Sequence, residues 1–169
     1  MNTIRQKMNI WAMIFVLICG IPASVCLAGP EIPLWQGQTV YVPVYSHIYS
    51  GDRERPFDLA ATLSIRNTDP VRSLTIVSAD YYDSEGRLLA HYLKEPKPLG
   101  PMASVRYVVK ESDREGGSGA NFLVRWTSDR PVNAPVIQGV MIGTKNQQGI
   151  SFLSQGQVIR EHTPDKRKR

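Results

Sequence analysis

Residues 57–66 read FDLAATLSIR, and this stretch decides the fold class. Apolar side chains stand at every second position from 57 to 65, with polar or small residues between them. A period of two places alternate side chains on the same face of a β-strand, so the stretch predicts a strand with one buried face. The turn signal NTDP follows at 67–70, because Asn and Asp side chains bond their own backbone and Pro fixes φ.

Similar strand patterns recur on both sides of this stretch. We expect further strands at 40–49, 74–82, 87–94, 105–109, 120–127 and 136–142, with short runs at 150–153 and 158–159. Turn signals recur about every 8–12 residues, and no long helical period follows the first 28 residues. The sequence therefore predicts an all-β, antiparallel β-sandwich of immunoglobulin-like type over 39–159, with about seven to nine strands. Pro43 cannot donate to a ladder, so its strand should lie at a sheet edge or carry a bulge.

The N-terminal segment 1–28 has the plan of a secretory signal. A basic start precedes a compact apolar run at 11–19, and small residues lead to a cleavage site after Ala28. The run is shorter than the roughly 20 residues that a membrane-spanning helix needs, although retention as an anchor remains an alternative. We therefore expect an exported protein, periplasmic or secreted, with no stable membrane span after cleavage and a lead-in segment at 29–38.

The positions of the cysteines and of the charged residues exclude several kinds of site and partner. Both cysteines, Cys19 and Cys26, lie in the leader, so a trimmed chain has no disulfide, thiolate metal site or cysteine nucleophile. The net charge of +5 resides at the two ends, because residues 29–159 hold 13 basic and 13 acidic side chains. A neutral body gives no reason to expect nucleic acid as a partner. Residues 160–169 hold five basic and two acidic side chains and are expected to form a disordered tail that can contact anionic surfaces.

The glycine-rich stretch 113–122, DREGGSGANF, is the first candidate site. As a phosphate loop it lacks the required Lys, and as a nucleophile elbow around Ser118 it precedes a strand where a helix is needed, although Asp129 and His162 follow in hydrolase order. Asp113, Glu115 and Asn121 could offer oxygens to a cation, and exposed amides could form an anion-binding nest. The simplest interpretation is a tight connection whose glycines supply positive φ.

Aromatic and histidine residues give two further candidates. Tyr41, Tyr45 and Tyr49 share a predicted strand face with His47, and this face could stack on sugar rings or on a partner, or simply pack against neighbouring strands. His47 and His91 could bind a metal if their strands were adjacent. No ligand spacing supports such a site, so ordinary hydrogen-bonded histidines, no metal and no cofactor are the expectation.

Four blocks resemble a known family. They are GQTVYVPVYSHIY at 37–49, LSIRNTD at 63–69, YYDS at 81–84 and GGSGANF at 116–122. Over roughly residues 37–159 the chain resembles the bacterial exported proteins grouped as domain of unknown function 3124. The resemblance implies an envelope location, and it implies no activity and no catalytic or binding residue.

The leading hypothesis is a non-catalytic binding or interaction module of the bacterial cell envelope, with an envelope protein or glycan as partner. An unpaired sheet edge or an aromatic face would carry the recognition. The alternative is an envelope hydrolase or metal-dependent enzyme that uses the glycine-rich stretch with His47 or His91. No catalytic residue is assigned, and Asp113, Ser118 and Asn121 join the aromatic face as candidate binding residues.

Overall fold

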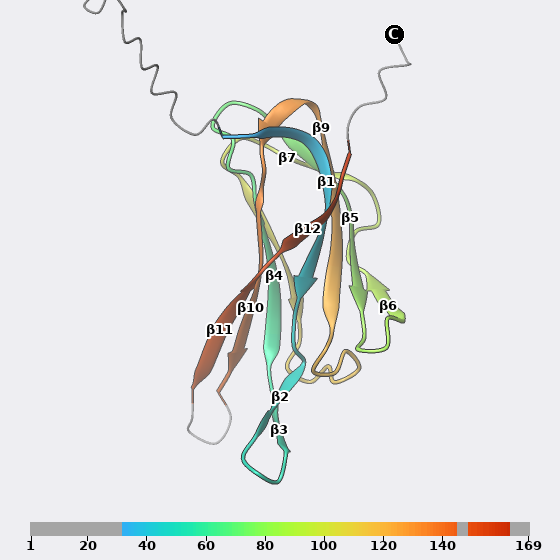
Figure 1. The fold of residues 1–169 in the computed structure, drawn as a ribbon, viewed down its shortest axis with the longest axis vertical. Coiled ribbons are helices and arrows are strands. Elements are labelled where there is room, and N and C mark those ends of the chain that lie inside the picture. Colours follow the sequence, from blue (N-terminus) through green and yellow to red (C-terminus); the bar gives the residue numbers. More distant parts are fainter. Residues whose placement is uncertain (1–31, 145–148, 163–169) are drawn as a thin grey trace, which may run out of the picture. The chain divides into compact units, whose positions relative to one another are not determined.

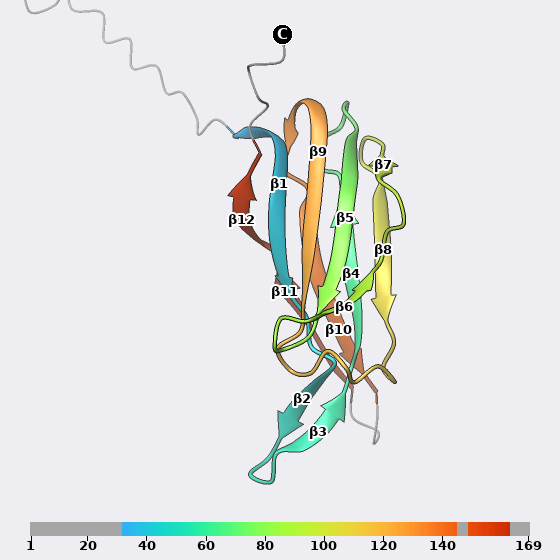
Figure 2. The same cartoon turned by 90° about the vertical axis from the view of Figure 1, so that its right-hand side faces the viewer.

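The computed structural model describes residues 32–144 and 149–162. Within these ranges the chain forms twelve strands and no helix (Figures 1 and 2). Consequently, the described residues contain no helix of the length and apolar character needed to cross a bilayer. The predicted leader 1–28 and residues 163–169 of the predicted tail lie outside the described residues.

The larger sheet has six strands in the order β12-β1-β9-β5-β6, with β7 also paired to β5. All of its pairings are antiparallel. The backbone of β1 lies between β9 and β12, so the register of these three strands decides which side chains meet on the sheet faces. The strands are β1 Leu34–Pro43, β5 Leu74–Tyr82, β6 Leu88–His91, β7 Lys97–Leu99, β9 Asn121–Asn133 and β12 Gln157–Glu161.

The smaller sheet is also antiparallel and has the order β11-β10-β4-β8. Figure 2 shows it behind the strands β1, β9 and β5 of the larger sheet. A separate hairpin, β2 paired with β3, extends past the end of both sheets (Figure 1). These strands are β2 His47–Ser50, β3 Arg55–Asp58, β4 Ala60–Arg66, β8 Ser104–Val109, β10 Val136–Gly143 and β11 Ile150–Gln155.

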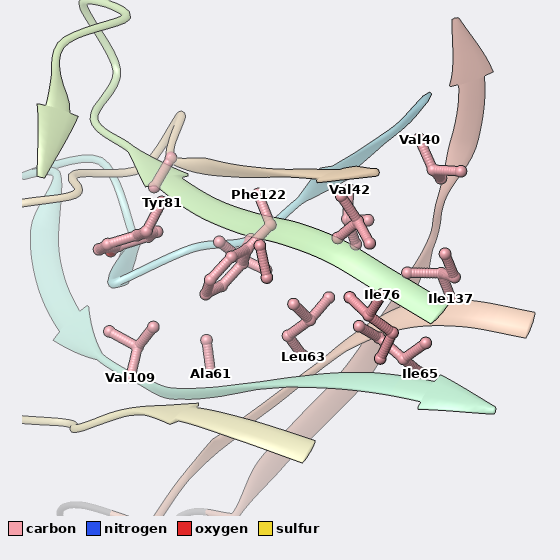
Figure 3. Close-up of a cluster of buried hydrophobic side chains, with 14 of the residues drawn as sticks. Val40, Val42, Ala61, Leu63, Ile65, Ile76, Tyr81, Val109, Phe122 and Ile137 are labelled. Carbon is pink, nitrogen blue, oxygen red and sulfur yellow. The ribbon is translucent and has the colours of Figure 1, made fainter. Parts of the chain in front are cut away.

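The core fills the space between the two sheets. Side chains from β1 and β5 point toward those of β4 in Figure 3, as in Val42 and Ile76 against Leu63. Trp126 and Phe122, from alternate inward positions of β9, are fully buried. Burying one large apolar side chain stabilises a fold by about 1.5–3 kcal/mol, so these alternating residues hold the sheets together. The predicted all-β antiparallel sandwich is confirmed.

Two predicted strands are interrupted, which is one reason why twelve strands replace the predicted seven to nine. The expected strand at 40–49 divides into β1 and β2, because the amides of Val44 and Ser46 bond to carbonyls of Ala120 and Gly117 in the glycine-rich stretch. The expected strand at 57–66 divides into β3 and β4 at Leu59, whose amide donates to the carbonyl of Ser46 at 2.8 Å.

The ends of the predicted domain also differ from the observed strands. β1 begins at Leu34, inside the predicted lead-in, and β12 continues to Glu161, past the predicted start of the tail. Pro43 is the last residue of β1 and lies beyond the final pairing of β1 with β12, between Tyr41 and Gln157. Its strand is therefore internal to the sheet and carries register shifts between Trp35 and Gly37 and between Thr39 and Val40. Val42 and Pro43 lie beyond the last pairing with β12, where the hydroxyl of Ser154 donates to the carbonyl of Pro43.

Candidate functional site

The glycine-rich stretch is packed against the body of the domain. A Cβ on Gly116 would lie 1.9 Å from the hydroxyl of Tyr81 and 2.7 Å from Oγ of Ser46. Gly117 has a φ of +77°, which side-chain-bearing residues rarely adopt. Gly116 is required because no side chain fits between it and Tyr81 and Ser46. Gly117 is required because its backbone adopts a positive φ.

Hydrogen bonds also use the amides that a nest would need. The amide of Gly119 donates to Oγ of Ser84 at 2.9 Å, and that hydroxyl donates to the carbonyl of Gly116. The amide of Gly117 donates to the carbonyl of Arg114 at 3.3 Å. The amides of Gly117 and Gly119 are therefore engaged within the protein, and the stretch acts as a joint between segments.

The residues of the possible hydrolase triad lie at opposite ends of β1. Ser118 lies next to residues that bond to Val44 and Ser46, after the end of β1. The amide of His162 donates to the carbonyl of Gly37, near the start of β1. Val44 lies seven residues after Gly37 along extended chain, which is about 23 Å at 3.3 Å per residue. Ser118 and His162 therefore cannot act on one substrate atom.

The carboxylate of Asp113 stabilises the local turn. It accepts a hydrogen bond from the amide of Glu115 at 3.0 Å. Burial, and after it the charge of Asp113, raises the pKa of Tyr92. Tyr92 is partly buried and packs against the fully buried Tyr81 and Phe122.

The three tyrosines do not form one stripe. Tyr41 lies in β1, whereas Tyr45 follows the end of β1 and packs edge-on against Phe152 of β11 at 5.7 Å between ring centroids. Tyr49 lies in the hairpin, where its hydroxyl is 3.2 Å from Nε2 of His47. The prediction of a shared face is wrong, because the backbone leaves the sheet between β1 and β2.

The two histidines have separate partners. His47 lies opposite Asp58 in the hairpin, and the carboxylate of Asp58 accepts a hydrogen bond from the guanidinium of Arg114. His91 lies in β6, with Nδ1 at 2.7 Å from Oδ1 of Asp80. Among the described residues, no three His, Cys, Asp or Glu side chains gather in a way that could hold a metal ion.

The outer face of the larger sheet brings together residues that are far apart in sequence. Residues directly opposite in adjacent antiparallel strands point to the same face. One row runs Arg160–Thr39–Arg125–Ser78 across β12, β1, β9 and β5. The next row runs Gln157–Tyr41–Leu123–Asp80–His91 from β12 to β6, and a third joins Asn121 to Tyr82.

This face is hollowed into a groove of about 410 Å³, which we call the outer-face groove. It spans four adjacent strands, from β12 to β5, and is therefore about 14 Å wide at 4.8 Å per strand. Tyr41 and Asn121 lie beside it on the same face, whereas none of the predicted site residues lines it. The lining residues are Thr39, Asp80, Tyr82, Leu123, Arg125, Ile159 and Arg160.

Charge is unevenly distributed along the groove. Arg125 and Arg160 lie on either side of Thr39. Arg125 donates through Nε to the hydroxyl of Ser78 at 3.1 Å. At the β5 end, Asp80 is paired with His91. The groove is therefore cationic at the β12 end and holds a carboxylate–imidazole pair at the other.

A hydroxyl–imidazole contact borders the cationic end. Oγ1 of Thr39 lies 2.8 Å from Nε2 of His162. Only 7% of Thr39 is exposed, so this contact fixes the imidazole against β1. It also attaches the chain after β12 to the sheet.

The sequence offered only a partial signal for this groove. Alternation in β1, β5 and β9 indicates which residues point outward, including Thr39, Asp80 and Arg125. It does not indicate strand order or register, so residues from four strands could not be assigned to one surface.

The fold and the groove define an all-β sandwich domain with a hollowed, polar outer sheet face. The chain belongs to the family described as protein of unknown function (DUF3124), whose model matches residues 37–159. The resemblance seen in the sequence is thereby confirmed at the level of the family. No curated protein matches the chain. Among solved structures, the chain is similar to the crystal structure of Thermotoga maritima 1070, with a TM-score of 0.44 and 12% identity over 71% of this chain and 92% of that one.

Proposed function

We propose that the protein is a non-catalytic binding module of the bacterial cell envelope and that its ligand, an envelope glycan, occupies the outer-face groove. One observation carries the proposal: side chains from four strands converge on a single hollow of about 410 Å³. Ligand sites are concave and combine apolar surface with a few convergent polar groups. Leu123 and Ile159 supply the apolar part here, and Thr39, Asp80 and Arg125 supply polar groups.

The rigidity of the sheet supports this assignment. β1 and β9 pair over nine residues, from Leu34 opposite Asn133 to Pro43 opposite Asn121. Side chains on paired central strands are held in place before a ligand arrives, which reduces the entropy lost on binding. The hairpin that carries Tyr49 is a less suitable binding site, because its strands β2 and β3 pair only with each other.

The edge strand β12 is a poorer recognition element than the groove. Its pairing with β1 shifts register between Thr39 and Val40, which leaves Ile159 as an extra residue in β12. A bulge twists an edge away from a regular ladder and is a common protection against strand addition. β12 is therefore better suited to forming a wall of the groove than to accepting a partner strand.

The envelope location is part of the proposal. It is supported by the basic and apolar order of residues 1–28 and by the mature chain's lack of cysteine. Fractionation of cells that express the full chain, followed by N-terminal sequencing of the product, tests this part. We expect an exported protein that begins at Gly29, and an uncleaved cytoplasmic product would contradict it.

Binding is tested by titrating the purified chain with a panel of envelope-derived oligosaccharides in a calorimeter. Replacing Tyr82, which lines the groove, by Ser should weaken the tightest ligand about tenfold. Tyr49→Ser, on the exposed hairpin, is the matched control and should bind as the wild type does. Equal affinity of the Tyr82→Ser protein, or turnover of the ligand, would refute the proposal.

A further inference from the structure

We propose that the ligand of the outer-face groove is an acidic polysaccharide, whose carboxylates are bound between Arg125 and Arg160. This inference rests on the proposed function and specifies its ligand. Both arginines line the groove and stand in one cross-strand row, on either side of Thr39. Their Cα atoms are two strands apart, or about 10 Å, so two long side chains can approach one carboxylate from opposite sides.

Neither arginine is used in an ion pair within the described part of the chain. Ion pairs between described residues join Arg87 to Asp83 and Glu85, His91 to Asp80, and Arg114 to Asp58. Arg125 bonds to Ser78 through Nε alone, so this contact does not use its two terminal nitrogens. A guanidinium presents paired N–H groups that match a carboxylate, and those of Arg125 and Arg160 have no acidic partner within residues 32–144 and 149–162.

The far end of the groove favours a sugar over a lipid headgroup. Asp80 is held by His91 through Oδ1, which leaves Oδ2 able to accept a hydrogen bond from a hydroxyl group. Tyr82 adds an aromatic surface beside it. A ligand with carboxylates at one end of this span and hydroxyls at the other matches the groove, and an acidic polysaccharide carries both groups on each residue. A phosphatidylcholine headgroup has no hydroxyl for Asp80, and a phosphatidylglycerol headgroup has hydroxyls but no sugar ring that could stack on Tyr82.

Basic residues that follow Arg160 in the sequence would also attract an acidic polysaccharide. Arg160 is followed within nine residues by Lys166, Arg167, Lys168 and Arg169. A cluster of like charges raises the local concentration of a polyanion and accelerates its association. The groove would then supply selectivity, whereas the last residues would supply attraction that depends strongly on salt.

The test uses polygalacturonate oligomers as the acidic probe, neutral galactan oligomers of equal length as the uncharged probe, and vesicles of phosphatidylcholine and phosphatidylglycerol as the lipid probe. Affinities are measured by calorimetry with the full mature chain. The variants are Arg125→Gln with Arg160→Gln, Asp80→Asn, and a chain without residues 163–169. The matched control is Arg106→Gln, an exposed arginine in β8 of the other sheet.

We expect the acidic oligomer to bind at least about tenfold more tightly than the neutral one. The double arginine variant should lose this preference, Asp80→Asn should weaken both sugars, and Arg106→Gln should change nothing. Removal of residues 163–169 should weaken the acidic oligomer at low salt while preserving its preference over the neutral one. Unchanged unfolding temperatures would show that the variants are folded.

Three results would overturn the inference. Equal binding of acidic and neutral oligomers that is lost in Tyr82→Ser would preserve the proposed function and exclude the acidic ligand. Binding of vesicles in place of either sugar would assign the basic surface to lipid. Equal loss of the acidic preference in Arg106→Gln and in the double variant would show that total charge, and no defined pair, determines the affinity.

Discussion

The glycine-rich stretch and the outer-face groove differ in how much the sequence suggested about them and in what they do. The stretch is conspicuous in the sequence, yet its glycines are held against Tyr81, Ser46 and Ser84, and its amides bond within the protein. The groove is inconspicuous in the sequence, because its lining comes from four separate strands. A local cluster of unusual residues here marks a structural joint, and scattered ordinary residues mark the candidate binding surface.

This comparison predicts different consequences of mutation. Residues of the joint are close-packed, so changes there should reduce the free energy of unfolding. Arg125 and Arg160 in the groove are exposed, so changes there should leave stability nearly constant and alter binding.

The largest effect is expected for Gly116→Ala. The added Cβ would lie 1.9 Å from the hydroxyl of Tyr81, so the joint must open or Tyr81 must move. We expect the free energy of unfolding to fall by about 3 kcal/mol, measured by urea denaturation. Gly100→Ala is the control, because a Cβ there meets nothing within 4 Å, and it should be nearly neutral. Full stability of Gly116→Ala would show that the stretch is not a packed joint.

A smaller effect is expected at low pH from Asp69. The backbone amides of Val71 and Arg72 donate to its carboxylate and hold the pKa of Asp69 below the ordinary 3.8. The unfolded chain therefore takes up the proton first, and the stabilisation is present above pH 3.8 and lost as the pH falls through the folded pKa. Asp69→Asn should be less stable at neutral pH and decline less steeply in acid. Parallel stability curves against pH would contradict this.

Tyr81→Phe should cost about 1 kcal/mol of unfolding free energy at neutral pH, because it removes the hydrogen bond to Ser46. Combined with Gly116→Ala, it should recover part of the stability, since the atom closest to the new methyl group is gone. A double-mutant cycle measures this coupling. Strictly additive losses would show that Tyr81 is not the residue that excludes a side chain at Gly116.

Tyr81 also predicts a loss of stability in alkali. Burial raises the pKa of Tyr81 from 10.0 to about 12. The unfolded chain loses the phenolic proton first, so this contribution is intact below pH 10 and is lost as the pH rises from 10 toward 12. Tyr81→Phe should show a shallower decline over that range in alkaline denaturation curves. An identical decline in both proteins would count against the buried phenol as the cause.

The smallest change in stability is expected for Arg125→Gln with Arg160→Gln, within about 0.5 kcal/mol of the wild type. Both side chains are exposed, and neither forms an ion pair among the described residues. A large loss of unfolding free energy, measured under the same denaturing conditions as for Gly116→Ala, would show that the groove arginines also stabilise the fold, as the joint does. Unchanged stability of the double variant would show that the groove arginines, unlike the residues of the joint, do not hold the fold together.

Much of the fold was predictable from local pattern. Alternation at 57–66 and 120–127 correctly identified the buried faces of β4 and β9, including Leu63, Ile65 and Phe122. Asp58 was expected to point outward, but it is buried, as are Phe57 and Leu59 on either side of it, and its carboxylate accepts a hydrogen bond from the guanidinium of Arg114. Tyr41, Tyr45 and Tyr49 were assigned to one face because the break after β1 depends on bonds to residues more than 70 positions away, which local alternation does not show.

Local sequence pattern specifies that the domain is built from strands with one apolar face, because the period of two is a property of neighbouring residues. Tertiary structure alone decided which strands are adjacent and in which register, and therefore that Arg160, Thr39, Arg125 and Ser78 form one row. It also decided that the glycines face Tyr81 and Ser84. The physical reason is that strand pairing is a long-range contact, fixed by the packing of the whole core and not by residues near in sequence.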